Sequence, residues 1–196
     1  MAQPRFGFEI LSSRLKTENN GHLVGGASTF YYYEIDRELD PTTYSFTAGA
    51  YYILHERHLL KLRIGRHRNG RILDLRAYDD IGSTYTYSGA DNPYQYFVLA
   101  PSYTYRLLNK KFIIPLEIGL QMNESVQKHE IGFVGVDLYN FDMAMSAGLQ
   151  YRIANYFIIG LHGKYIHYLS EYQWGIERGT FKPRQYGMEL SLMYEL

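Results

Sequence analysis

Residues 186–196 read Tyr-Gly-Met-Glu-Leu-Ser-Leu-Met-Tyr-Glu-Leu and close the chain. Every even position in this stretch is apolar or aromatic, and every odd position except Met193 is small or charged. A period of two is the pattern of a β-strand whose two faces meet different surroundings. The stretch therefore predicts a strand with one apolar face and one polar face.

This strand has a glycine near its start, Gly187, and a hydrophobic residue at its end, Leu196. In both respects it resembles the C-terminal assembly signal of bacterial outer-membrane β-barrels, although those more often end in Phe. The resemblance implies that the same alternation recurs along the whole chain.

The composition narrows the class of protein. The 196 residues are enough for one domain, spanning 1–196, and they include 21 Tyr, 10 Phe and 18 Gly. The absence of Cys excludes disulfides and thiolate metal sites. A net charge of zero gives no electrostatic reason to expect nucleic acid as a partner. No apolar run approaches the roughly 18 residues of a membrane helix, so a membrane location requires a barrel.

The alternation recurs in eight stretches, which we interpret as strands. They are roughly 4–14, 42–54, a third from 58, 94–107, 111–122, a sixth ending at 151, 156–169 and 186–196. Short turns at 55–57, 108–110 and 152–155 alternate with longer loops at 15–41, 79–93, 123–132 and 170–183. This asymmetry is typical of outer-membrane barrels. Residues 71–78 are interpreted as an extension of the third strand above the membrane. The sequence predicts an all-β fold, a closed eight-stranded antiparallel up-and-down transmembrane β-barrel with both termini at the short-turn, periplasmic end.

The charged residues of the strands support this interpretation because they lie opposite the apolar series. Leaving aside Glu195 at the chain end, they are Glu9, Lys61, Arg63, Arg106, Glu117, Asp142, Lys164 and Glu189. A Lys or Arg facing lipid at mid-bilayer costs about 2–4 kcal/mol, so these side chains should face the lumen. We expect them to form a network of ion pairs that fills the barrel, since buried charges need partners. The alternative is a narrow gated pore for small solutes.

In a soluble eight-stranded barrel such as a lipocalin, the apolar face of each strand points inward and the polar face points to solvent. We favour the membrane because the charged face carries many Gly, Ser and Ala, which suit a narrow lumen, whereas the apolar face is bulky and aromatic.

With eight alternating strands in place, nearly the whole chain resembles the small outer-membrane barrels of the OmpA, OmpX and OmpW type, and more loosely the Tyr-rich barrels of Bacteroidota. The resemblance implies a location in the bacterial outer membrane, contact with the lipid bilayer and lipopolysaccharide, and contact with other outer-membrane proteins. Such barrels include anchors, surface proteins, accessory subunits and lipid-modifying enzymes, so the fold does not choose a function. The start Met1-Ala2-Gln3 carries no export signal, and we interpret it as a mature N-terminus behind a replacement Met.

Candidates for catalysis are weak. Lipid A deacylases pair a His and a Ser two residues apart on one strand face, whereas His167 and Ser170 are three apart and His162 is farther away. Asp79-Asp80 and His129-Glu130 fall in predicted loops, where solvated charge is the simpler interpretation. We expect no enzyme activity, no cofactor and no metal site, with a lipid A deacylase or acyltransferase type of enzyme as the alternative.

Two prolines lie inside predicted strands, where proline cannot donate a ladder hydrogen bond. Pro101 and Pro115 flank the turn at 108–110, so we expect them to lie near each other across that hairpin. A bulge or a non-bonded position is the simpler interpretation, and a weakened lateral seam is the alternative.

The first long loop contains an aromatic cluster, Phe30, Tyr31, Tyr32 and Tyr33. Exposed aromatic clusters mark binding surfaces, so this segment is a candidate partner surface. We expect it to form a hairpin that continues the first two strands above the membrane.

Overall fold

The computed structural model describes residues 5–18, 23–28, 31–39, 42–68, 72–78, 84–90, 95–109, 111–125, 139–169, 173–174, 177–178 and 184–196. Its main body is a closed barrel of eight strands, which confirms the predicted fold class. The barrel strands are β1 (Arg5–Glu18), β4 (Thr42–His55), β5 (His58–Arg68), β8 (Gln95–Asn109), β9 (Phe112–Ser125), β10 (Tyr139–Arg152), β11 (Phe157–Tyr168) and β14 (Arg184–Glu195).

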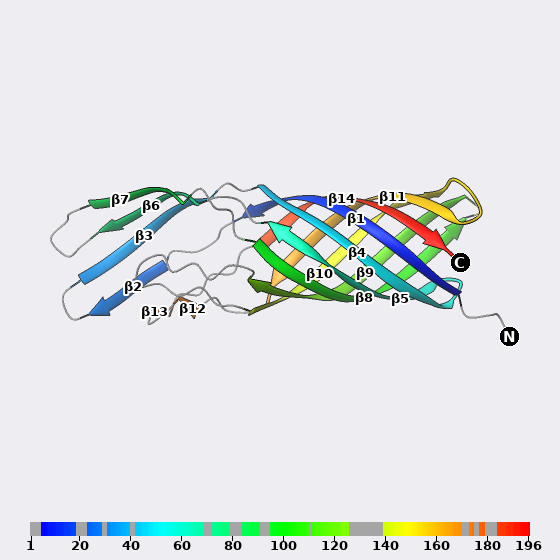
Figure 1. Ribbon diagram of the computed structural model, residues 1–196, viewed down its shortest axis with the longest axis horizontal. Helices are drawn as coiled ribbons and strands as arrows, with labels where there is room; N and C mark the ends of the chain where they lie inside the picture. Colours follow the sequence, from blue (N-terminus) through cyan, green and yellow to red (C-terminus); the bar gives the residue numbers. More distant parts are fainter. Residues whose placement is uncertain are drawn as a thin grey trace.

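Each barrel strand pairs antiparallel with the next barrel strand along the chain, and β14 closes the barrel against β1. Short turns join β4 to β5, β8 to β9 and β10 to β11 at one end. The start of β1 and the end of β14 lie at this same end (Figure 1). We call it the terminal end, and the opposite one the loop end.

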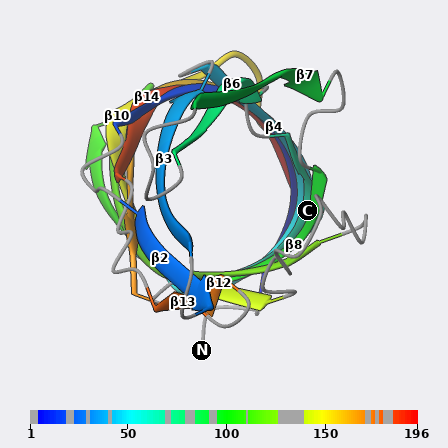
Figure 2. The same ribbon diagram turned by 90° about the vertical axis from the view of Figure 1, so that its left-hand side faces the viewer.

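Smaller strands stand beyond the loop end (Figures 1 and 2). β2 (Leu23–Ser28), β3 (Tyr31–Leu39), β6 (Ile72–Tyr78) and β7 (Thr84–Ala90) form a four-stranded sheet in the order β2-β3-β6-β7. β12 (Gln173–Trp174) and β13 (Glu177–Arg178) form a short ladder. Among the described residues, no helix is long and apolar enough to cross a membrane.

The sheet corrects two sequence interpretations. Residues 79–93 are not all loop, because β7 lies within them; the alternating Thr-Tyr pairs of 84–87 favour a strand more strongly than the flanking glycines oppose it. Residues 72–78 lie beyond the barrel wall, as expected, but they form the separate strand β6, which pairs with β3 and β7 and does not continue β5. The expected hairpin in the first loop is present as β2 and β3.

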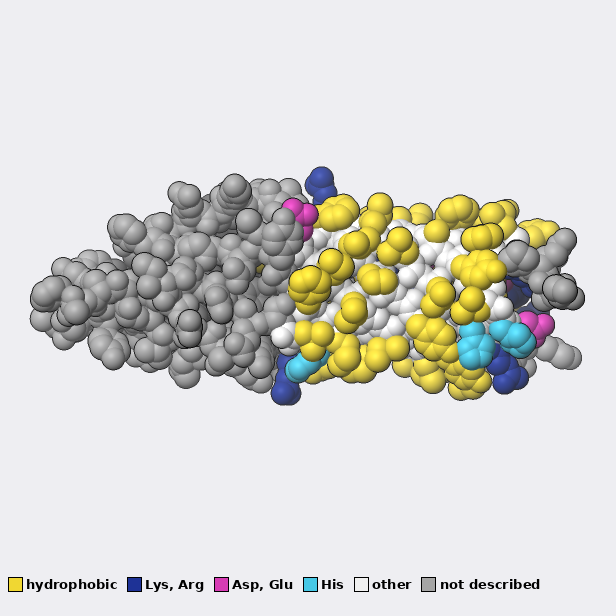
Figure 3. All heavy atoms as spheres, turned by 90° about the horizontal axis from the view of Figure 1, so that it is seen from below, with side chains coloured by type: hydrophobic (Ala, Val, Ile, Leu, Met, Phe, Trp, Pro, Cys, Tyr) yellow, Lys and Arg dark blue, Asp and Glu magenta, His cyan; other side chains and the backbone are white. Residues whose placement is uncertain are grey.

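Side chains alternate between the lumen and the outer surface as the sequence predicts. On β14, Leu190 is 61% exposed whereas Ser191 is 7% exposed. On β5, Leu60, Leu62 and Ile64 face outward. Apolar side chains cover the barrel wall in Figure 3, with charged side chains gathered towards its two ends. An apolar belt of this kind is suited to hydrocarbon.

Aromatic contacts mark the terminal end of this belt. Ring centroids are 5.0 Å apart for Phe6 and Tyr52, and 5.0 Å apart for Phe157 and Tyr194. Such a row matches the interfacial girdle of a membrane barrel.

The prolines do not lie as predicted. Pro115 is opposite Arg106, while Pro101 lies between the pairs Leu99–Met122 and Ser102–Gly119, so the two prolines are not neighbours. The register also resumes unchanged after Pro101, so β8 and β9 contain no bulge there. The ladder between β8 and β9 skips Pro101 because proline has no N–H to donate, whereas on the β5 side Pro101 is paired with Leu62.

The assigned register predicts a depth-dependent cost for charge on the outer face. Leu190→Arg at mid-strand should lower the free energy of unfolding from lipid vesicles by about 2–4 kcal/mol, whereas Leu169→Arg, just beyond the end of β11, should lower it by about 0–1 kcal/mol. Denaturant titration in vesicles measures both. Equal costs would mean that Leu190 does not face the bilayer core.

Candidate functional site

Four charged side chains form the centre of the lumen. Lys61 Nζ lies 3.0 Å from Glu9 Oε2 and 3.0 Å from Glu117 Oε2. Arg63 also bonds both carboxylates, and its Nη2 donates to Glu117 Oε2 at 2.8 Å. Thr104 Oγ1 donates to the same oxygen at 2.9 Å. Two acids and two bases thus neutralise one another, and we call these four residues the central ion cluster.

The central ion cluster ties together strands that are not neighbours. Glu9 lies on β1, the two bases on β5 and Glu117 on β9, with β4 and β8 between them. All four side chains are almost completely shielded from solvent. Losing one member would leave an uncompensated charge, which costs far more than the intact pairs gain. The cluster therefore fixes how the strands close around the lumen.

A second group lies on β11 and β14. Lys164 Nζ is 2.8 Å from Glu189 Oε2. Beside this ion pair, His162 Nε2 is 2.9 Å from Ser191 Oγ. A Cβ atom at Gly160 would come within 2.6 Å of Ser191 Oγ and 2.7 Å of His162 Nε2. Only glycine at that position leaves room for the His–Ser pair.

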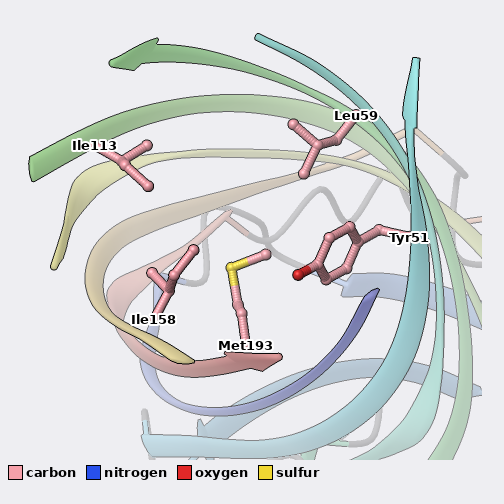
Figure 4. Packing of buried hydrophobic residues seen from close by; sticks show 5 residues of the cluster. All are labelled: Tyr51, Leu59, Ile113, Ile158 and Met193. Carbon is pink, nitrogen blue, oxygen red and sulfur yellow. The ribbon is translucent and has the colours of Figure 1, made fainter. Parts of the chain in front are cut away.

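The terminal end of the lumen is closed by an apolar cluster of Tyr51, Leu59, Ile113, Ile158 and Met193 (Figure 4). The Tyr51 ring lies across Gly7, where any Cβ atom would overlap it. The Tyr51 hydroxyl donates to the Tyr194 carbonyl at 3.1 Å. Tyr51 therefore seals this end both by packing and by a hydrogen bond to the barrel wall.

Arg106 completes the seal at the terminal end. Its guanidinium carbon lies 5.8 Å from the centroid of the Tyr51 ring, within cation–π range. Its Nη1 is 2.5 Å from Glu195 Oε1, and Arg152 Nη2 is 2.8 Å from Glu195 Oε2. Glu195, which the sequence analysis set aside as terminal, is thus the partner of Arg106. Its odd position in the alternation was the signal that it faces inward.

Asp142 stands apart from the ion pairs. Asn123 Nδ2 donates to its Oδ2 at 2.5 Å, and Gln121 Nε2 donates to Asn123 Oδ1 at 2.9 Å. The structure thus divides the eight predicted lumen charges: four meet in the central ion cluster, Lys164 pairs with Glu189, and Arg106 and Asp142 find other partners.

Within the described residues, the space beside the central ion cluster is small. The cavity beside the central ion cluster, lined by Arg63, Glu117, Ser102 and Lys164 among others, has a volume of about 20 Å³. A single water molecule needs at least about 10–15 Å³. Ser102 Oγ lines this cavity and has no hydrogen-bond partner within the described part of the chain. This cavity is large enough for one water molecule and too small for a passing solute.

The other sequence candidates do not converge on a site. His167 stacks against Tyr165 away from His162, with the ring planes 17° apart. Ser170, Asp79-Asp80, His129-Glu130 and Phe30 lie outside the described residues; Tyr31, Tyr32 and Tyr33 are described only in the backbone of β3. Within the described residues, no group of His, Asp and Glu could hold a metal ion.

The fold matches solved outer-membrane barrels at low sequence identity. OprG from Pseudomonas aeruginosa superposes with a TM-score of 0.61 and 7% identity, covering 98% of this chain and 95% of OprG. The Neisserial surface protein NspA gives a TM-score of 0.52 at 10% identity, covering 97% of this chain and 96% of NspA. Ail of Yersinia pestis, solved with the heparin analogue sucrose octasulfate, gives 0.50 at 12% identity with 100% of both chains covered. No protein-family description and no curated sequence matches the chain.

The central ion cluster predicts a pair of linked stability changes. Arg63→Met leaves Glu117 or Glu9 uncompensated and should lower the free energy of unfolding by about 3–5 kcal/mol. Adding Glu117→Gln restores neutrality, because Lys61 still pairs with Glu9, and should recover most of that loss. Urea unfolding in lipid vesicles measures both variants. A loss below about 1 kcal/mol for Arg63→Met, typical of exposed ion pairs, would contradict a buried cluster.

Proposed function

We propose that this protein is a non-enzymatic, integral outer-membrane barrel with a plugged polar lumen, acting as a structural or interaction component at the cell surface. The observation that carries this proposal is the sealed interior. Ion pairs fill the middle of the lumen, Tyr51 and Arg106 close the terminal end, and the cavity beside the cluster holds about 20 Å³. A barrel whose interior is used for packing presents only its wall and its ends to other molecules.

The part that would meet a partner is the four-stranded sheet beyond the loop end. Within the described sheet, β2 and β7 are the outer strands. Outer strands offer backbone hydrogen-bonding groups to a strand of another chain. Tyr31, Tyr32 and Tyr33 of the aromatic segment begin β3, one of the two inner strands. This arrangement suits an accessory subunit that docks on a larger outer-membrane protein.

The proposed orientation places both termini in the periplasm and the sheet outside the cell. Short periplasmic turns and longer external segments are the rule for such barrels, and the terminal end here carries the short turns. In this orientation the loop end meets lipopolysaccharide and the outside medium. Ail, a barrel of the same fold, has been solved in complex with the heparin analogue sucrose octasulfate.

One observation favours a lipid-modifying enzyme as the second candidate. His162 and Ser191 have the hydrogen-bonded geometry of a base and a nucleophile. Two features weigh against it: both residues are buried in the lumen, and His162 Nδ1 has no orienting partner within the described residues. A narrow solute channel is a weaker candidate still, because the lumen is filled.

The sealed lumen predicts almost no conductance. Purified protein in planar bilayers should show no sustained channel openings, since buried charged pairs and the terminal apolar cluster leave no continuous water path. A refolded sample that spans the bilayer, verified by its protection from added protease, is the control. Large and stable single-channel currents would overturn the proposal.

The interaction role predicts a partner that depends on the aromatic segment. Replacing Tyr31, Tyr32 and Tyr33 by Ser should remove a protein that otherwise co-purifies in fixed proportion from native outer membranes, because aromatic side chains contribute much of the binding energy at protein interfaces. Changing Tyr151 and Tyr156, two exposed tyrosines at the terminal end, to Ser serves as a matched control away from the sheet. Absence of any partner, together with altered lipid A in a deletion strain, would instead support the enzyme.

A further inference from the structure

A groove interrupts the apolar belt on the outer wall of the barrel. It has a volume of about 540 Å³ and crosses β10, β11 and β14. Its outward-facing residues are Met145, Ala147, Gly163, Tyr165, Tyr186 and Met188. Elsewhere on this wall, large side chains such as Leu161 and Leu190 fill the surface. The groove is therefore a local gap in the layer of side chains that meets lipid.

The gap exists because two small residues lie side by side. Gly163 is paired with Ala147 on β10 and with Met188 on β14. The nearest atom to a Cβ built on Gly163 is the Ala147 carbonyl oxygen at 3.8 Å, so a side chain would fit there without strain. Packing of the protein itself does not require glycine at this position, unlike Gly7 or Gly160. The groove is an open space on an otherwise bulky face.

Positive charge gathers beside the groove. Arg14 on β1 is paired with Met188, and Lys16 with Tyr186. Arg184 lies two residues before Tyr186, on the same outward face at the loop end of β14. All three side chains are exposed, and none forms an ion pair with another described residue. One acidic residue, Glu18, is paired with Arg184 in register. Three basic residues against one acidic residue leave this stretch with a net positive charge.

We propose that this groove binds one phosphorylated lipid of the surrounding leaflet. One acyl chain lies over Gly163 and Ala147 between the Tyr165, Tyr186 and Met188 side chains. The phosphate lies at the interface, where Arg14, Lys16 and Arg184 donate charge-assisted hydrogen bonds to it. The apolar groove suits the acyl chain of such a lipid, and the basic residues beside it suit the phosphate, which lies nearer the membrane surface.

A bilayer lipid is the occupant that the position favours. The groove opens into the apolar belt, so hydrocarbon surrounds it, and an anionic headgroup complements the exposed side chains of Arg14, Lys16 and Arg184. A second copy of the chain would bring its own Arg14, Lys16 and Arg184 towards the same cations if it bound through the same face. The inference rests on the membrane location proposed above and not on the sealed lumen, so either can fail without the other.

Native mass spectrometry of the full chain in maltoside micelles tests the inference. We expect one phosphatidylglycerol molecule to bind, with diacylglycerol of the same chains bound roughly tenfold more weakly because it lacks the phosphate. Gly163→Leu should weaken phosphatidylglycerol roughly tenfold by filling the groove. Arg14→Gln combined with Arg184→Gln should remove most of the preference for phosphatidylglycerol over diacylglycerol.

Matched controls lie elsewhere on the same outer wall. Ala50→Leu on β4 and Arg66→Gln on β5 change an outward small residue and an outward cation away from the groove, and both should bind lipid as the wild type does. If Gly163→Leu does not fold, Ala147→Leu fills the same space. Wild-type binding by folded groove variants, equal binding of diacylglycerol, or a lipid-free dimer would each overturn the inference.

Discussion

The structure depends on the neutralisation of charge inside a narrow barrel. Alternation places the outward face of every strand in hydrocarbon, so charged side chains of the membrane span must share the lumen. There they are shielded from water and need a compensating partner, which is an opposite charge for most of them and the Asn123 amide for Asp142. Glu9, Lys61, Arg63 and Glu117 answer this constraint as a group, joining β1, β5 and β9 across two intervening strands. Gly49 lies against Arg63 of this group, where a Cβ atom would come within 2.8 Å of the Arg63 side chain.

The proposed function places contacts with other molecules on the outside of the barrel. In the part of the chain that the structure describes, the cavity beside the central ion cluster has a volume of only about 20 Å³, and the surfaces left for such contacts are the sheet beyond the loop end and the lipid-facing wall. These two surfaces differ in kind. The sheet offers backbone edges suited to protein partners, whereas the groove at Gly163 combines an apolar floor with neighbouring cations suited to a lipid. One rigid barrel can thus support both kinds of contact.

The alternation in the sequence was sufficient to predict the eight barrel strands and the face on which Glu9, Lys61 and Glu189 lie, because a period of two assigns each side chain to one side. It could not predict which charges meet. Partners depend on the stagger of the closed barrel, which brings Glu117 to Lys61 and His162 diagonally to Ser191. β7 was missed because turn residues surround it, and the groove was missed because one glycine on an apolar face has no distinctive pattern.

Accessibility along β14 tests the central claim most directly. The chain has no Cys, so single cysteines on β14 can be probed in vesicles without background, by a spin label at the outward, even positions 186–194 and by a small water-soluble thiol reagent at the inward positions 189, 191 and 193. The account predicts that labels at the even positions collide with oxygen dissolved in the bilayer and not with a water-soluble nickel chelate, while cysteines at the inward positions do not react. Rapid reaction of the inward cysteines would reveal a water-filled lumen, and even positions open to the chelate would mean that the apolar face does not meet lipid.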